Sequence, residues 1–310
     1  MVGSQFVPTS PAPRRLSMMS MLTSTGVAMQ LSTAFQQRRE RLALRTHELS
    51  RMRPRPRPRV NIKRALIPLV GVGLVVIIWQ LIALLEIYPA FIIPPPLDVL
   101  AQFQESLADG TLWLHTSTTV WQMLGGLALG AFSGVALGYV IAKHRTLETI
   151  LSPLIVAVQS TPVVAYAPLL VIWFGSGATS KVLISTFIVF FPMLMNTAIG
   201  IRGVPTSLRD LMRSLNATRW QMFTKLEVPA ALPVLLGGLK VSATLAVIGA
   251  VVGEFVSADA GLGKLISVAR YSYDTPLVFV AVITLALIAR VMYGAVSLAE
   301  RRLLAWQRRA

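Results

Sequence analysis

Six long apolar segments dominate this sequence and restrict it to folds that cross a membrane. The first, residues 65–85, contains 21 residues and no charged side chain. As a helix rising about 1.5 Å per residue it would span roughly 30 Å, the thickness of a bilayer core. Comparable segments follow at 117–142, 150–174, 182–201, 233–253 and 277–298. Because backbone polar groups in lipid must be paired within the protein, we predict an all-α, polytopic bundle of six transmembrane helices.

Composition argues against the main soluble alternatives. Only 14% of the 310 residues are charged, against about 25% in soluble proteins. The chain has no cysteine and only three scattered histidines, which excludes thiolate sites and argues against a metal cluster. The nearest imitation of a phosphate-binding loop has Ala258 and Leu265 where that motif needs Gly and Ser or Thr. We therefore expect no cofactor, no metal and no enzymatic activity in this chain.

Positive charge is concentrated before the first apolar segment. Residues 1–64 carry a net charge of +11, and the remainder carries +5. DNA binding is one interpretation, but basic residues that flank membrane helices on the cytoplasmic side explain the excess better, so we expect no nucleic acid partner. Alternating Arg and Pro at 51–59 disfavour a helix. We predict that residues 1–64 form a disordered basic tail, unless translation starts at Met52 and residues 1–51 are not made.

The loops between the apolar segments define an orientation. Lys and Arg gather in loops 143–149 and 202–232 and after residue 298, whereas loop 86–116 has none. This bias predicts that both termini are cytoplasmic. Lys240 and Arg290, inside the fifth and sixth segments, are expected to reach toward the cytoplasmic interface. On the other side of the membrane, Pro94-Pro95-Pro96 followed by Asp98 favours the start of a short helix outside the bilayer.

Glycine recurs every fourth residue in segment 117–142. The four residues share one helix face and are Gly126, Gly130, Gly134 and Gly138. Small residues on one face let a neighbouring backbone approach closely. We predict helix packing within one subunit at this face, and a weaker version of it at Gly249 and Gly253.

The loop 202–232, called the elbow below, is too short for a domain and too patterned for a linker. Thr206 or Ser207 could cap one short helix, and Asn216 could end it in a left-handed conformation. Thr218 could cap a second helix, which should stop near Pro229. An apolar ridge accompanies basic residues in this helix-turn-helix and consists of Leu211, Leu215, Met222, Phe223 and Leu226. DNA binding is one interpretation, and docking of a cytoplasmic protein is favoured by the tether to two membrane segments.

The elbow resembles the conserved cytoplasmic loop of binding-protein-dependent ABC importer permeases. The signature of that loop is Glu-Ala-Ala, three residues, Gly, nine residues, Ile, one residue, Leu-Pro. The corresponding positions of this chain are Asp210-Leu211-Met212, Asn216, Leu226 and Val228-Pro229. The spacing is kept throughout, but Leu211 and Met212 are bulkier than two alanines, so a standard ATPase groove would need a matching change. Further family-like motifs are Trp173-Phe174-Gly175, Phe190-Phe191-Pro192 and Gly261-Leu262-Gly263.

The resemblance covers residues 65–305 and implies a bacterial permease domain, with residues 1–64 outside it. It implies two permease copies, most simply a homodimer in the cell membrane, that work with a cytoplasmic ABC ATPase dimer and an extracytoplasmic solute-binding protein. It also implies that Asp210, Leu211, Met212, Leu215, Asn216, Leu226 and Pro229 contribute to ATPase coupling. The branch of this family that the chain most resembles imports nitrate, sulfonates, taurine, pyrimidine precursors and riboflavin. Within that branch, residues 259–280 look closest to riboflavin and pyrimidine-precursor permeases.

Polar residues within the apolar segments are candidates for the transport pathway, because polar groups in lipid are costly. The candidates are Gln159, Ser160, Thr161, Asn196 and Glu254. Hydrogen bonding between helices is the alternative role for each, and Glu254 could instead lie among lipid headgroups. A secondary transporter or channel is the alternative function, but such a protein has no need of a docking elbow.

Overall fold

The computed structural model describes residues 62–308, with side chains described from Val70 to Trp306. The chain divides into two units, Met1–Val70 and Gly71–Ala310. Of the first unit only the start of one helix is described. The predicted disordered tail and the alternative start at Met52 therefore lie outside the described residues, apart from 62–64.

Between residues 62 and 308 the chain is helical and has no strand, which confirms the all-α prediction. The α-helices are α2 (Ile62–Leu84), α3 (Pro96–Ala108), α4 (Thr111–Lys143), α5 (Arg145–Ser160), α6 (Val163–Phe174), α7 (Ala178–Arg202), α8 (Thr206–Ser214), α9 (Arg219–Met222), α10 (Val228–Val256), α11 (Leu262–Tyr271) and α12 (Thr275–Leu303). A π-helix, η1 (Phe223–Glu227), joins α9 to α10, and a short 3₁₀ helix, η2 (Ala305–Arg308), follows α12.

Four described helices are long and apolar enough to cross a membrane. They are α4, α7, α12 and the continuous helix Arg219–Val256, which joins α9, η1 and α10. The pair α5 and α6 counts as a fifth crossing if the bent pair is one span. The part of α2 whose side chains are described, Val70–Leu84, is apolar but shorter. Membrane crossing is thus supported, whereas the predicted number of six is not confirmed among the described residues.

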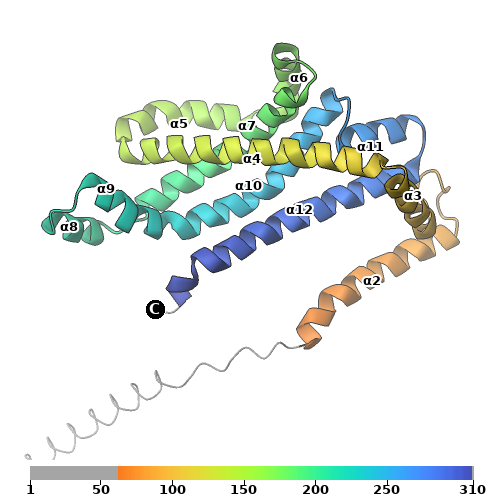
Figure 1. Ribbon diagram of the computed structural model, residues 1–310, viewed down its shortest axis with the longest axis horizontal. Helices are drawn as coiled ribbons and strands as arrows, with labels where there is room; N and C mark the ends of the chain where they lie inside the picture. The colour runs from red at the N-terminus through yellow and green to blue at the C-terminus, as the bar shows by residue number, and fades with distance from the viewer. Residues whose placement is uncertain (1–61, 309–310) are drawn as a thin grey trace, which may run out of the picture. The chain divides into compact units, whose positions relative to one another are not determined.

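The helix α7 packs on both α4 and α10, and α12 packs on α10 (Figure 1). The glycine face of α4 forms the contact with α7, because a β-carbon at Gly130 would lie 2.7 Å from the carbonyl oxygen of Thr186. At Gly138 it would lie 2.8 Å from Thr197 Cβ. From α10, a β-carbon at Gly249 would lie 2.5 Å from Ser185 Cα in α7. The predicted close packing within one subunit is therefore confirmed.

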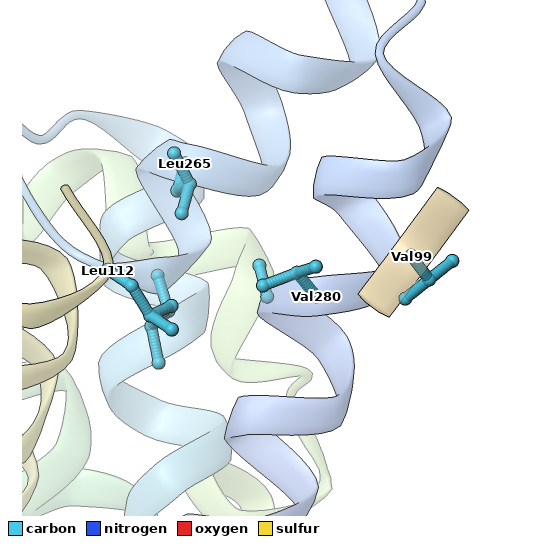
Figure 2. Close-up of a cluster of buried hydrophobic side chains, with 6 residues drawn as sticks. Val99, Leu112, Leu265 and Val280 are labelled. Carbon is cyan, nitrogen blue, oxygen red and sulfur yellow. The ribbon is translucent and has the colours of Figure 1, made fainter. Parts of the chain in front are cut away.

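Short helices close one end of this bundle. α3 begins at Pro96, with Pro95 before it and Asp98 in its first turn, so the predicted short helix is confirmed. A buried apolar cluster packs α3 and α11 against the adjoining ends of α4 and α12. Figure 2 shows four of its members, which come from four different helices: Val99, Leu112, Leu265 and Val280.

One charged side chain inside a predicted segment has a partner on a neighbouring helix. Lys240 of α10 forms an ion pair with Glu300 of α12, and the two side chains are 18% and 22% exposed. The prediction for Lys240 did not include this partner, which the neighbouring helix places within its reach. A partly buried charge is stabilised by such a partner. Arg290 is exposed.

Candidate functional site

The elbow forms the predicted helix-turn-helix at the end of the bundle opposite α11 (Figure 1). Its turn centres on Asn216, whose φ of 53° lies in the left-handed region, as predicted. The N–H of Ala217 donates to the carbonyl of Met212 at 3.0 Å, and the N–H of Asn216 donates to that of Arg213 at 2.9 Å. These two bonds satisfy carbonyl groups at the end of α8, as in a Schellman motif.

The two helices of the elbow start in different ways. Thr218 caps α9 as predicted: its Oγ1 accepts the N–H of Gln221 at 3.2 Å, and the Gln221 side chain accepts the N–H of Thr218 at 2.9 Å. The predicted caps of α8, Thr206 or Ser207, are wrong, because the capping position is Pro205 and no side chain caps that helix. With φ restricted by its ring, Pro205 sets the turn into the helix without a side-chain bond.

Large apolar side chains are exposed on the elbow. Leu211 is 54% exposed, Leu215 69% and Trp220 70%. Leu208 is also exposed and lies one helical turn before Leu211, so α8 presents three leucines on one face. Trp220 and Leu208 were missed by the sequence reasoning, although the spacing of Leu208 signals the same face. The other three members of the predicted ridge are half-buried. An apolar surface of this kind is typical of a protein docking site.

The remaining predicted coupling residues divide by exposure. Asp210 is exposed and pairs with Arg213 at 3.2 Å, an arrangement that contributes at most about 1 kcal/mol. Met212, Leu226 and Pro229 are half-buried. Asp210 is therefore available to a partner, whereas these three side chains are partly covered within the chain.

The second helix of the elbow does not stop at Pro229, which corrects the prediction. It continues through η1 into α10 as one helix, Arg219–Val256, of 38 residues. In η1 the N–H of Val228 donates to the carbonyl of Phe223, five residues back. Proline lacks an N–H and clashes with the carbonyl four residues back in a regular α-helix. The wider π turn ends two residues before Pro229, which then takes an early position in α10 where proline is tolerated.

A buried carboxylate beneath the elbow was missed by the sequence reasoning. Glu227 is 1% exposed and forms an ion pair with Lys143, the last residue of α4. Its other oxygen accepts the hydroxyl of Tyr139 at 3.1 Å. These partners precede Glu227 by more than 80 positions in the sequence, so no local pattern indicates the contact.

Three pathway candidates lie at a sharp bend rather than within a straight span. α5 ends at Ser160, α6 begins at Val163, and the two helices meet at 94°. The segment predicted as one span, 150–174, is therefore divided into two helices by this bend. Thr161 is extended, with φ −81° and ψ 123°, which is the conformation favoured before a proline, here Pro162.

All three candidates at the bend are exposed within this chain: Gln159, Ser160 and Thr161. The hydroxyl of Ser160 donates to the carbonyl of Val156 at 2.7 Å, and that of Thr161 donates to Ala157 at 3.1 Å. Both hydroxyl protons are thus used by the preceding turn of α5.

The other two candidates have partners inside the chain. Asn196 is half-buried and its Nδ2 donates to the carbonyl of Pro192 at 2.8 Å. Glu254 is 1% exposed, which contradicts a position among headgroups. Its carboxylate accepts the hydroxyl of Thr119 at 2.7 Å and the N–H of Gly263 at 2.6 Å. Glu254 thereby fastens the start of α11 to α4 and α10.

Comparison with known proteins agrees with this architecture. Residues 134–305 match the family described as the binding-protein-dependent transport system inner membrane component. The riboflavin transport system permease protein RibX of Chloroflexus aurantiacus is 45% identical over 234 residues, covering 76% of this chain and 87% of RibX. The formylaminopyrimidine transport permease protein ThiX of Halalkalibacterium halodurans is 32% identical, covering 79% and 98%.

A further relative and a solved structure point the same way. The putative aliphatic sulfonates transport permease protein SsuC of Bacillus subtilis is 32% identical, covering 84% of this chain and 93% of SsuC. A chain of the inward-facing MetNI methionine ABC transporter shares the fold, with a TM-score of 0.52, 21% identity, and coverage of 64% and 96%. This chain therefore belongs to the family of binding-protein-dependent transport system inner membrane components, as the multi-pass permease subunit of an ABC importer in the cell membrane.

Proposed function

We propose that this permease imports riboflavin. The observation that carries the substrate is the 45% identity with a permease named for riboflavin transport, compared with 32% for the sulfonate and formylaminopyrimidine relatives. In this proposal residues 65–305 form the permease domain. A solute-binding protein delivers riboflavin to the outer face, and ATP hydrolysis takes place in a separate subunit.

The elbow is the proposed docking site for the ATPase. Leu208, Leu211 and Leu215 form an exposed apolar face on α8, and Trp220 extends the exposed apolar surface on α9. Asp210 adds an exposed carboxylate beside them. A helix with such a face suits insertion into a groove of another protein. ATP-driven closure of two ATPase subunits would draw the two elbows of a permease dimer together.

The proposed orientation places the elbow and both termini in the cytoplasm. The elbow and the end of α12 lie at the same end of the bundle (Figure 1). Basic residues gather at this end, including Lys143 at the end of α4 and Arg301 and Arg302 near the end of α12. Such an excess is typical of the cytoplasmic side of membrane proteins.

The bend between α5 and α6 is the proposed pathway region. α5 has no buried residue, so most of its surface is left uncovered by the described part of this chain. We propose that a second permease copy faces this surface and that Gln159, Ser160 and Thr161 line the space between the copies. Proline at the bend frees backbone carbonyls, which a polar solute could use as acceptors.

Uptake of labelled riboflavin tests the substrate. The permease is reconstituted in liposomes with an ABC ATPase that co-purifies with it and a riboflavin-binding solute-binding protein. We expect ATP-dependent riboflavin uptake that excess unlabelled taurine does not reduce. Uptake of taurine or formylaminopyrimidine but not of riboflavin would contradict the proposed substrate. Riboflavin uptake by the permease alone, driven by an ion gradient, would instead indicate the secondary-transporter alternative.

A further inference from the structure

A buried charge pair fastens the elbow to a spanning helix. One oxygen of Glu227 contacts the ammonium of Lys143, and the other accepts the hydroxyl of Tyr139. Both partners belong to α4 and lie one helical turn apart, so a single helix supplies both contacts to the carboxylate. Glu227 is 1% exposed, and an unpaired carboxylate at such a position would be strongly destabilising. We call these three side chains the Glu227 clamp.

The clamp is continuous with the exposed surface of the elbow through an aromatic stack. The Trp220 ring, which is 70% exposed, lies 5.6 Å from the ring of Phe223. Phe223 in turn packs edge-on against Tyr139 at 5.1 Å. Tyr139 therefore contacts η1 in two ways, through its ring and through its hydroxyl. A force applied at Trp220 has a packed route to the carboxylate of Glu227.

Beyond the clamp, α4 and α7 are in backbone contact. A β-carbon at Gly138, next to Tyr139, would lie 2.8 Å from Thr197 Cβ, and one at Gly134 would lie 2.7 Å from the carbonyl oxygen of Phe190. Interfaces packed this closely have little room to slide or deform. A displacement of the elbow end of α4 should therefore carry α7 with it.

We propose that the Glu227 clamp transmits movement of the elbow to α4 and α7, so that Glu227, Lys143 and Tyr139 are positioning residues for ATP-driven transport. This inference rests on the proposed docking of an ATPase at the elbow. Without the clamp the exposed face of α8 is intact, so the ATPase still binds and hydrolyses ATP. The movement is then absorbed at the loosened joint, and less substrate crosses for each ATP.

Three variants test whether an effect comes from the Glu227–Lys143 ion pair itself. Glu227→Gln keeps the size of the side chain and an acceptor for Tyr139 but removes the charge. The double variant Glu227→Lys with Lys143→Glu reverses the pair. Glu300→Gln is a matched control, because it neutralises the Lys240 pair between α10 and α12, which involves no residue of the elbow.

The measurement is the amount of riboflavin transported per ATP hydrolysed by the reconstituted complex. We expect Glu227→Gln to retain the ATPase during purification and to lower this ratio about tenfold, within the usual range of coupling between sites. The reversed pair should restore most of the ratio, and Glu300→Gln should leave it at the wild-type value. An unchanged ratio in Glu227→Gln, an equal loss in Glu300→Gln, or no restoration by the reversed pair overturns the inference.

Two further variants keep the test decisive. If Glu227→Gln fails to assemble, Tyr139→Phe removes only one hydroxyl, and a lowered ratio supports the clamp whereas a wild-type ratio overturns it. Leu215→Glu tests the docking proposal separately, because it puts a charge on the exposed elbow face. Retention of the ATPase and of uptake by Leu215→Glu contradicts docking at the elbow. If Leu215→Glu loses both the ATPase and uptake while Glu227→Gln keeps the wild-type ratio, the clamp proposal is contradicted and the docking proposal is not.

Discussion

Replacing Gly134 by alanine tests the close approach of α4 and α7. The added β-carbon would lie 2.7 Å from the carbonyl oxygen of Phe190 and 2.8 Å from Met193 Cβ. The first obstacle is backbone, which cannot rotate away as a flexible side chain would. Ordinary van der Waals contact starts near 3.4 Å, so the two helices must separate locally by about 0.7 Å.

The expected magnitude follows from two opposing effects. Overpacking of a close-packed interior typically costs about 1–3 kcal/mol. Alanine favours a helix interior by about 1 kcal/mol relative to glycine, which offsets part of that cost. We therefore expect a net destabilisation of up to about 2 kcal/mol. In a protein of similar size, about 1 kcal/mol moves Tm by roughly 2–4 °C.

Thermal unfolding in detergent, followed by tryptophan fluorescence, measures this effect. Gly134→Ala should lower the apparent Tm by up to about 8 °C. Gly237→Ala in α10 is the matched control, since no atom lies within 4 Å of its added β-carbon. Its only expected effect is the gain in helix propensity, so its Tm should equal or exceed that of the wild type. Equal Tm values for the two variants would refute the argument that the glycine face holds the helices together.

Three further predictions concern orientation, the elbow turn and the pathway. In intact cells, an impermeant thiol reagent should label a single cysteine at Ser176 but not one at Ser214, and the reverse pattern would overturn the proposed topology. Asn216→Val should abolish riboflavin uptake, because a β-branched residue resists a φ of 53°. Asn216→Gly should retain uptake, and normal uptake by both variants would show that the turn is not required. Gln159→Leu should slow initial uptake, normalised to inserted protein, because it deletes a polar group of similar volume; a wild-type rate would assign Gln159 to packing.

Local chemistry made a large part of this protein predictable. Long charge-free segments indicate membrane helices because lipid requires every backbone polar group of a span to be paired within the protein. The four-residue period of glycine placed the α4–α7 contact on the correct face, since a helix repeats its face at that spacing. Asn216 and Thr218 marked the turn of the elbow because each makes its characteristic bonds within a few residues of itself.

The prolines predicted where a helix is interrupted but not the path of the chain at the interruption. Pro162 and Pro229 both signal that a regular helix is interrupted, but the outcomes differ. At Pro162 the chain turns by 94°, and at Pro229 it passes straight on after a π turn. Pro162 follows an extended Thr161 beside an uncovered helix, whereas Pro229 follows a segment whose Glu227 is held against α4. The neighbouring helices therefore decide between a break and a continuation.

The long-range polar contacts were decided by tertiary structure alone. Glu227 meets Lys143, Glu254 meets Thr119 and Lys240 meets Glu300 only after the helices have packed. In the sequence Glu254 is one acidic residue near the end of a span, compatible with a pathway or a headgroup position. Its burial and its two hydrogen bonds result from where α4 and α11 come to lie. A buried charge depends on partners that lie in distant segments of the sequence. The residues around it in its own segment therefore show that a charge is present but cannot predict its partners or its burial.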